Sequence, residues 1–289
     1  MRAAGHEVHL ETLVPETPFP FPWPVVDFFD AFPECVQLDA PPLRPLGIAA
    51  DTQFDLVILT YQVWYLSPAL PMTAFLQSAE GRQLIGGKPV ITLVACRNMW
   101  LSAQATMKQL ISAAGGRLID HISFTDQGHP LATFITTPRW VWTGKRDSFL
   151  GLPPAGVSPE EIRQARRFGL ALAEGLDNDR EESGQPMLSG LRAVTVNPRL
   201  AISERAGRRA FGVWSKLIRK FGRRGQWRRR PMVLLFVVYL IALILSVVPL
   251  SLLLQWLFSP LLRPRLERLK ADLEQPSGSQ EFNLQKYAP

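Results

Sequence analysis

The sequence predicts a doubly wound α/β domain built on a parallel sheet, followed by a transmembrane helix near the carboxyl end. Two nearly continuous apolar runs, residues 54–60 and 88–95, are typical of parallel strands that are buried on both faces. A long uncharged run follows, and a basic segment leads directly into it. These observations divide the chain into an α/β domain (1–176), a polar linker (177–204), a basic juxtamembrane segment (205–230), a transmembrane segment (231–262) and a polar tail (263–289).

Strands and helices alternate through the α/β domain, as expected for a doubly wound parallel sheet. Gly115 and Gly116 close the second helix, because glycine readily adopts the left-handed conformation that ends many helices. A capping box that begins at Ser158 starts the last helix of the domain. The predicted elements are strand 54–60, helix 71–80, strand 88–95, helix 100–114, strands 118–124 and 131–136, and helix 158–176.

The amino end predicts a sheet that is incomplete as written. Gly5 has the position of a helix C-cap before a strand at residues 7–10, yet only four residues precede it. One further strand, loop and helix would occupy roughly 25 to 35 residues. We therefore predict that the true start lies upstream of Met1, and that the sequence as given leaves an edge of its sheet exposed.

Residues 231–262 predict a helix that crosses a membrane. A helix needs roughly 20 apolar residues to span the hydrocarbon core, and a charged residue at its centre would cost about 3 kcal/mol. Pro249 predicts a kink or a local break, which transmembrane helices tolerate. Two other interpretations are a re-entrant hairpin bent at Pro249, which would keep both flanks on one side, and a buried core helix.

The basic segment sets the predicted orientation. It carries eleven Lys and Arg residues from Arg205 to Arg230 and no Asp or Glu, whereas the whole chain has a net charge of +7. Positively charged flanks stay in the cytoplasm, which places the α/β domain there as well. A position beside an apolar run favours anionic lipid headgroups as the partner over nucleic acid. Trp214, Leu217 and Phe221 lie at helical spacing among these cations, as in a helix at the membrane interface.

The cysteine and histidine residues predict neither a disulfide framework nor a metal site. Cys35 and Cys96 lie far apart, without metal-ligand spacing, and suit a reducing cytosol. His121 lies inside a predicted strand, which favours a core histidine over an acid–base group. His129 lies in a predicted turn and is better placed for proton transfer, but neither pattern identifies a catalytic residue.

Two predicted loops follow the carboxyl ends of neighbouring strands, where ligands bind in open α/β sheets. The first contains V-W-Y-L-S-P (63–68) and resembles the second flavin loop of flavodoxin-like quinone reductases, whose W-[FY]-x-x-P turn lines the isoalloxazine ring. The loop after the next strand stands where that fold has its third flavin loop. The resemblance implies a flavodoxin-like fold, FMN as cofactor and a binding site formed by Tyr61, Gln62, Val63, Trp64, Tyr65, Cys96, Arg97 and Asn98.

A closer resemblance covers about half of the chain. The motifs at residues 5–23, 28–34, 63–68, 96–100 and 138–146 resemble those of a bacterial family known as dialkylresorcinol condensing enzymes. This resemblance implies dialkylresorcinol or aryl-polyene lipid biosynthesis at the bacterial inner membrane, with a ketosynthase and an acyl carrier protein as partners. Since a flavodoxin-type sheet suits a redox step, the implied activity is a membrane-anchored oxidoreductase that aromatises a cyclohexanedione-like intermediate.

Two other functions stay open at this point. One is the condensing enzyme itself, with Cys96 as a thiolate whose pKa the adjacent Arg97 would lower; four histidines and the short chain do not suit the thiolase fold that such enzymes use. The other is a non-catalytic membrane scaffold for a ketosynthase and a carrier protein. It is favoured because the phosphate loop that follows the first strand of flavodoxin-like folds is absent from the sequence. Trp64 either stacks on a ring or packs within its loop.

Overall fold

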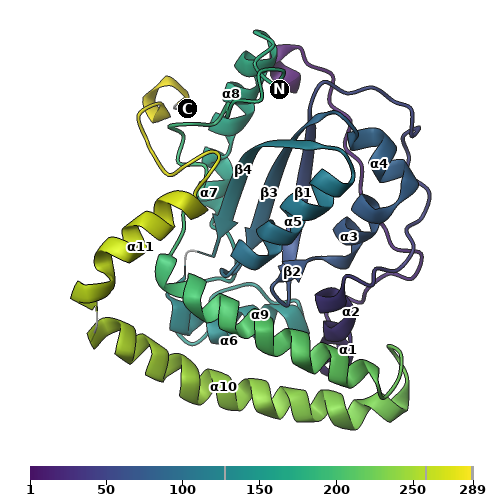
Figure 1. Ribbon diagram of the computed structural model, residues 1–289, viewed down its shortest axis with the longest axis vertical. Coiled ribbons are helices and arrows are strands. Elements are labelled where there is room, and N and C mark those ends of the chain that lie inside the picture. Colours follow the sequence, from purple (N-terminus) through teal and green to yellow (C-terminus); the bar gives the residue numbers. More distant parts are fainter. Residues whose placement is uncertain (127, 258, 288–289) are drawn as a thin grey trace.

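The core of the protein is a four-stranded, mostly parallel sheet (Figure 1). The computed structural model describes residues 1–126, 128–257 and 259–287. The strand order is β2-β1-β3-β4, and β2 alone is antiparallel to its neighbour. The predicted α/β class with a parallel sheet is therefore confirmed. The strands are β1 (Val57–Trp64), β2 (Ser67–Pro68), β3 (Pro89–Cys96) and β4 (Arg117–Thr125).

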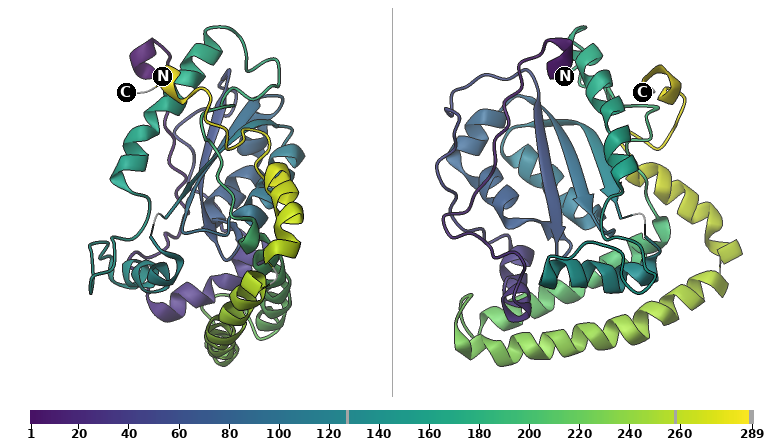
Figure 2. Two further views of the ribbon diagram at one scale, coloured as in Figure 1. Left: turned by 90° about the vertical axis from the view of Figure 1, so that its left-hand side faces the viewer. Right: turned by 180° about the vertical axis from the view of Figure 1, so that it is seen from behind.

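Helices cover both faces of the sheet (Figure 2). Successive side chains of a strand point to opposite faces; in β4, His121 contacts Trp100 at the start of α5, whereas Phe124 contacts Phe168 of α8. The helices before and after β3 are α3 (Leu70–Gln77), α4 (Ala79–Ile85) and α5 (Leu101–Ala113), and α7 (Pro159–Gln164) leads into α8 (Arg166–Leu176).

One predicted strand is wrong. Residues 131–136 belong to the helix α6 (Pro130–Thr143). Their Thr and Ile residues favour a strand, but the start and stop signals of a helix override that preference. Pro130 occupies the first turn, the ring of His129 accepts a hydrogen bond from the backbone N–H of Leu131 at 3.3 Å, and Gly144 ends the helix with a φ of 73°. His129 is thus a helix cap.

The amino end is also not a strand. Gly5 ends a short 3-10 turn (Arg2–Ala4) with a φ of 90°, as its predicted capping role requires, but residues 7–10 form no strand. The chain continues without regular structure and makes one isolated bridge, from Pro15 to Leu43. Within the described part of the chain, the first six residues of β1 pair with β3 on one side and with no strand on the other.

A layer of helices lies beyond the carboxyl ends of β1, β3 and β4 (Figure 1). Phe32 of α2 stacks on Phe236 of α10, with the ring centroids 4.0 Å apart, and Phe211 of α9 meets both rings edge-on. These aromatic residues form a hydrophobic cluster that is separate from the core of the sheet. Besides α6, the layer contains α1 (Val25–Asp30), α2 (Phe32–Gln37), α9 (Pro198–Arg219) and α10 (Arg230–Leu257).

The apolar run forms one continuous helix. The segment Trp227–Ser246, which includes most of α10, is long and apolar enough to span a membrane. Because α10 continues from Arg230 to Leu257, its backbone does not break at Pro249, and a hairpin bent at that residue is not the arrangement. The next helix, α11 (Ser259–Leu273), runs back toward the sheet (Figure 1).

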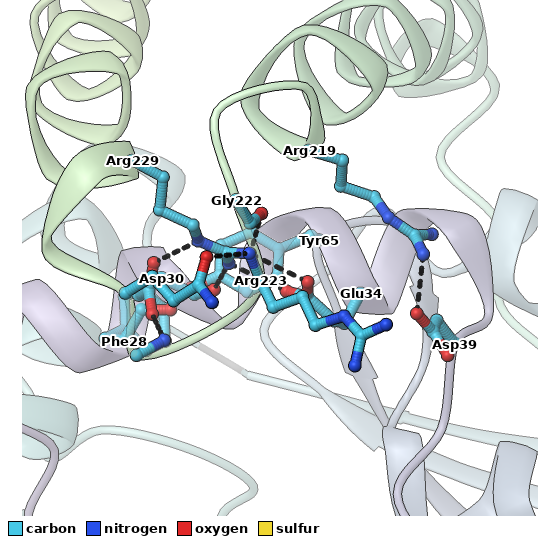
Figure 3. Close-up of polar contacts among 11 residues, drawn as sticks. Phe28, Asp30, Glu34, Asp39, Tyr65, Arg219, Gly222, Arg223 and Arg229 are labelled. Carbon is cyan, nitrogen blue, oxygen red and sulfur yellow. Dashed lines mark hydrogen bonds and ion pairs between the residues drawn. The ribbon is translucent and has the colours of Figure 1, made fainter.

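A buried ion cluster fixes the start of α10 to the first two helices (Figure 3). The side chain of Arg229 is fully buried: its Nε donates to Asp30 Oδ1 at 2.5 Å, and Nη1 and Nη2 donate to the two carboxylate oxygens of Glu34 at 2.8 Å each. The backbone N–H of Gly225 donates to the other oxygen of Asp30 at 2.7 Å. Since a buried guanidinium needs such partners, these bonds hold α1 and α2 to the turn before α10.

Candidate functional site

The first predicted loop is a tight turn with strained backbone. Tyr65 (φ 52°) and Leu66 (φ 61°) join β1 to β2, and both adopt the left-handed conformation. This conformation costs roughly 1–2 kcal/mol for each residue other than glycine. Contacts from other helices hold the turn: Arg208 of α9 donates to the carbonyl of Leu66 at 2.7 Å, and the Tyr65 hydroxyl donates to the carbonyl of Phe28. A two-residue hairpin turn requires this conformation at both of its central residues, so the pairing of β1 with β2 accounts for it.

The second predicted loop leaves the end of β3 and places a guanidinium beside the first. The Nε of Arg97 donates to the hydroxyl of Thr133 at 2.7 Å, and its guanidinium lies 3.8 Å from the ring centre of Phe134. Burial lowers the pKa of Arg97 to about 10, and the charge of Asp126 opposes that shift. Arg97 therefore remains a cation at neutral pH.

The two loops line one cavity of about 420 Å³ at the carboxyl ends of β1 and β3. This volume lies within the range of small-molecule sites. Six of the eight predicted site residues line it, and further segments supply the rest of its wall. The predicted residues in the wall are Gln62, Val63, Trp64, Tyr65, Cys96 and Arg97; the others are Phe21, Trp23, Phe28, Ala95, Asp126, Thr137, Trp140, Val141, Arg146, Gly156, Val157 and Ile162.

Two predicted site residues lie elsewhere. Tyr61 is buried in the core of the sheet, where its hydroxyl donates to Gln104 of α5 at 2.8 Å. The Tyr61 side chain thus faces α5, and Tyr61 is not among the residues that line the cavity. Asn98 lines a smaller hollow of about 180 Å³ between α5, β4 and α9. Tyr61 and Asn98 therefore do not line this cavity, and their predicted role in cofactor binding stays a prediction.

Sequence reasoning assigned no role to three residues that also line the cavity, Asp126, Trp140 and Arg146. Trp140 and Arg146 both lie in the motif P-R-W-x-x-T-G-K-R (138–146), which was the sequence signal that could have identified them as site residues. Arg146 donates from Nε to the carbonyl of Ala155 at 2.6 Å, and Asp126 accepts from the backbone N–H of Gly156 at 2.7 Å. These bonds fix the loop that follows α6 against the end of β4.

Aromatic rings form much of the cavity wall. Trp64 packs edge-on against Phe19 and Trp23, with ring centroids 5.0 and 5.5 Å apart, and donates from Nε1 to Gln62 Oε1 at 3.2 Å. Trp140, which also lines the cavity, contacts Phe21 with their ring centroids 6.5 Å apart. Edge-on contacts between aromatic rings are typically worth about 1 kcal/mol beyond the buried area, so these rings hold one another in place.

A polar group lies in the wall without a protein partner. Thr137 Oγ1 is shielded from solvent, and among the described residues it has no hydrogen-bond partner. A buried hydroxyl without a partner costs roughly 1–3 kcal/mol.

Cys96 does not have the environment of a nucleophilic thiolate. Burial raises the pKa of its thiol to about 12, and the charge of Glu204 raises it further. The expectation that Arg97 lowers this pKa is therefore wrong, because desolvation of the thiolate outweighs the neighbouring cation. No histidine stands in the described wall of the cavity either, so a Cys–His pair is not formed there.

His121 is a core residue, as predicted. It is buried in β4, and its Nδ1 lies 2.8 Å from the hydroxyl of Thr92, which also accepts from Gln104 Nε2 at 2.9 Å. This contact joins the ring of His121 to the buried Thr92–Gln104 pair. Burial lowers the pKa of His121 to about 3, so the ring is neutral.

The residues at this edge of the sheet fit the ring of FMN better than its phosphate. A phosphate is ordinarily held at the amino end of a helix that follows a strand. At the start of α5 that position is taken, because the carboxylate of Glu204 accepts a hydrogen bond from the backbone N–H of Ser102. Among the described residues, we find no phosphate cradle beside the cavity, and FMN stays a prediction.

No family model matches this chain, and neither a curated protein nor a solved structure matches it. Its function must therefore be inferred from the cavity and its surroundings.

Proposed function

We propose that this chain is a membrane-associated protein of dialkylresorcinol-type lipid biosynthesis, and that its cavity binds a ring-bearing, alkylated intermediate. One observation carries the proposal. Two loops that follow different strands place six predicted site residues around a single cavity with aromatic walls. The first of those loops is the two-residue turn at Tyr65 and Leu66, whose left-handed backbone belongs to the β1–β2 hairpin.

The charges of the cavity favour a ring with acidic oxygens. Arg97 and Arg146 line it together with one carboxylate, that of Asp126. Resorcinols and cyclic 1,3-diketones lose a proton from oxygen far more readily than simple alcohols, so a guanidinium would stabilise the anion that forms.

The position of the cavity favours alkyl substituents. Phe28 lines the cavity and also packs into the aromatic cluster that contains Phe236 of α10. One layer of side chains therefore separates the cavity from the helix that is long and apolar enough to span a membrane. Alkyl chains on the ring would have a short apolar path from the bilayer.

The reaction that we propose for this ligand is aromatisation of a cyclohexanedione-like ring. Two hydrogens leave the ring, one as a hydride to a two-electron acceptor and one as a proton to a base or to water. We assign the binding and orientation of the ring to this cavity and no residue to the acceptor. The second candidate is a scaffold without catalysis, which is favoured because Glu204 occupies the amino end of α5 and Cys96 stays a thiol.

Ligand binding is tested by tryptophan fluorescence of the full chain in detergent. Trp64 and Trp140 line the cavity, so a dialkylated resorcinol should quench them, and the matched dialkylbenzene without hydroxyls should bind at least tenfold more weakly, since charge-assisted hydrogen bonds contribute roughly 1.5–3 kcal/mol. Arg97→Met should remove most of that difference. Trp227→Phe, at a tryptophan that is 72% exposed and lies outside the cavity, is the control and should leave the difference unchanged.

Equal binding of the two ligands, or a preference that Arg97→Met leaves intact, would overturn the proposed ring recognition. Absorbance spectra separate the enzyme from the scaffold. A flavin spectrum that appears when FMN is added, together with its bleaching by a cyclohexanedione, supports the oxidoreductase. A protein that binds the resorcinol but stays colourless and turns over no diketone with any flavin or quinone acceptor supports the scaffold.

A further inference from the structure

The chain that follows α11 returns to the α/β domain. The hydroxyl of Ser277 donates to Asp120 Oδ1 of β4 at 2.6 Å and accepts from the backbone N–H of His121 at 2.8 Å. All three residues are buried. The backbone N–H of Val194 donates to the carbonyl of Gly278 at 3.1 Å. This segment is therefore part of the folded domain and must lie on the same side of a membrane as the sheet.

The chain that precedes α10 is tied to the same domain. In α9, the carboxylate of Glu204 accepts from the backbone of Ser102, and Arg208 donates to the carbonyl of Leu66. At the other end of the turn, Arg229 is fixed by Asp30 and Glu34 (Figure 3). The segment before α10 and the segment after α11 are thus both held by contacts with the α/β domain.

α11 cannot carry the chain back across a bilayer. Its 15 residues would reach about 22 Å, less than the hydrocarbon thickness of roughly 30 Å. They include six charged side chains, each costing about 3 kcal/mol at mid-membrane. The end of α10 must therefore lie on the side where the domain lies, which excludes a single crossing by α10.

One face of α10 is apolar and exposed. Leu234, Val238, Ile241 and Leu245 follow helical spacing and are 51 to 72% exposed. Near the start of α10 the opposite face is covered, since Phe236 packs fully buried against α2 and α9. A continuous apolar stripe of this kind needs an apolar partner.

The charges beside the stripe identify that partner as an anionic bilayer. The turn that leads into α10 carries exposed Arg223, Arg228 and Arg230, and α9 carries further exposed cations. Cations next to an apolar helix face attract the headgroups of anionic lipids. A second copy of this chain would bring the same cations together, which would oppose association.

We propose that α10 lies in the plane of one leaflet, with its exposed stripe in the acyl chains, and does not cross the membrane. This arrangement uses the exposed stripe from Leu234 to Leu245 as the membrane-facing surface of α10. It keeps the carboxyl-terminal segment beside β4 and places the carboxyl ends of the strands toward the bilayer (Figure 2). The inference rests on the contacts of both flanks and is independent of what the cavity binds.

Cysteine labelling tests the sidedness. Asp51→Cys in the domain and Gln285→Cys near the carboxyl end both replace exposed residues. In sealed vesicles of phosphatidylcholine and phosphatidylglycerol that carry the full chain, a membrane-impermeant maleimide should label both to the same extent before detergent is added. The wild-type chain measures the background from the two native cysteines. If one site reacts only after detergent, α10 crosses the bilayer and the proposal fails.

Depth measurement gives a second, independent readout. Nitroxide spin labels at positions 234, 238, 241 and 245 should all lie at a similar shallow depth, within roughly 5–10 Å of the headgroups. The depth is measured from the rates at which each nitroxide collides with oxygen and with a water-soluble nickel chelate. A spanning helix would instead change in depth by about 16 Å between positions 234 and 245. Such a gradient would overturn the proposal, as would shielding from both quenchers, which would mean that protein covers the stripe. A nitroxide at position 51 is the water-exposed control.

Discussion

Replacing Arg229 with alanine should destabilise the attachment of α10 by about 3–5 kcal/mol, the usual cost of removing one partner from a buried ion pair. The side chain is fully buried, and its three nitrogens donate to both carboxylates of the cluster at 2.5 to 2.8 Å. Without it, the charges of Asp30 and Glu34 would be left in an apolar layer. Arg229→Lys keeps the charge but not the bidentate fork, so it should lose less.

Urea unfolding in detergent micelles measures this loss, and hydrogen exchange of α1 and α2 locates it. Arg228→Ala and Arg230→Ala are matched controls, because both neighbours are exposed and each should change stability by less than about 0.5 kcal/mol. Combining Arg229→Met with Asp30→Asn and Glu34→Gln should restore much of the stability, since no buried charge then remains. If Arg229→Ala matched Arg228→Ala, the cluster would not hold α10.

Three further predictions concern the core. Burial lowers the pKa of His121 from 6.5 to about 3, so between pH 7 and pH 5 the unfolded chain takes up a proton at this residue and the folded chain does not. The free energy of unfolding of the wild type should therefore fall over this range. The variant His121→Asn, whose Oδ1 can still accept from Thr92, should lose about 2 kcal/mol less, as measured by urea titrations at the two pH values. With a pKa of about 12, Cys96 should react with iodoacetamide at pH 8 far more slowly than an exposed cysteine, and rapid alkylation seen by mass spectrometry would contradict its burial. Gly81→Ala would place its Cβ 1.9 Å from the carbonyl oxygen of Phe75 and should lower the melting temperature sharply, whereas Gly212→Ala, a helical site with nothing within 4 Å, should be neutral or stabilising by up to about 1 kcal/mol.

Most of the candidate site was predictable because strand ends are local features. The apolar runs that became β1 and β3 place their last residues at one edge of a parallel sheet, so Trp64 and Arg97 had to lie near each other. The position of Tyr61 outside the cavity has an equally simple cause. Neighbouring residues in a strand face opposite sides, and the sequence does not say which side of β1 meets α5.

The rest of the cavity depends on segments that no local pattern connects. Phe21 and Trp23 come from the proline-rich amino-terminal region, whereas Trp140 and Arg146 come from α6 and the loop after it. Residues 131–136 show how context decides between elements: β-branched residues favour a strand, but a capped start and a glycine stop made them part of a helix.

The sequence by itself determined the alternation of strands and helices, the long apolar helix and the basic segment before it, because composition and periodicity express these features within a few turns of chain. The tertiary structure decided where that helix lies. Arg229 meets Asp30 across 199 positions, and Ser277 meets Asp120 across 157. Contacts between such distant residues leave no periodic trace, yet they hold both flanks of α10 on one domain, which is the basis for proposing an in-plane helix.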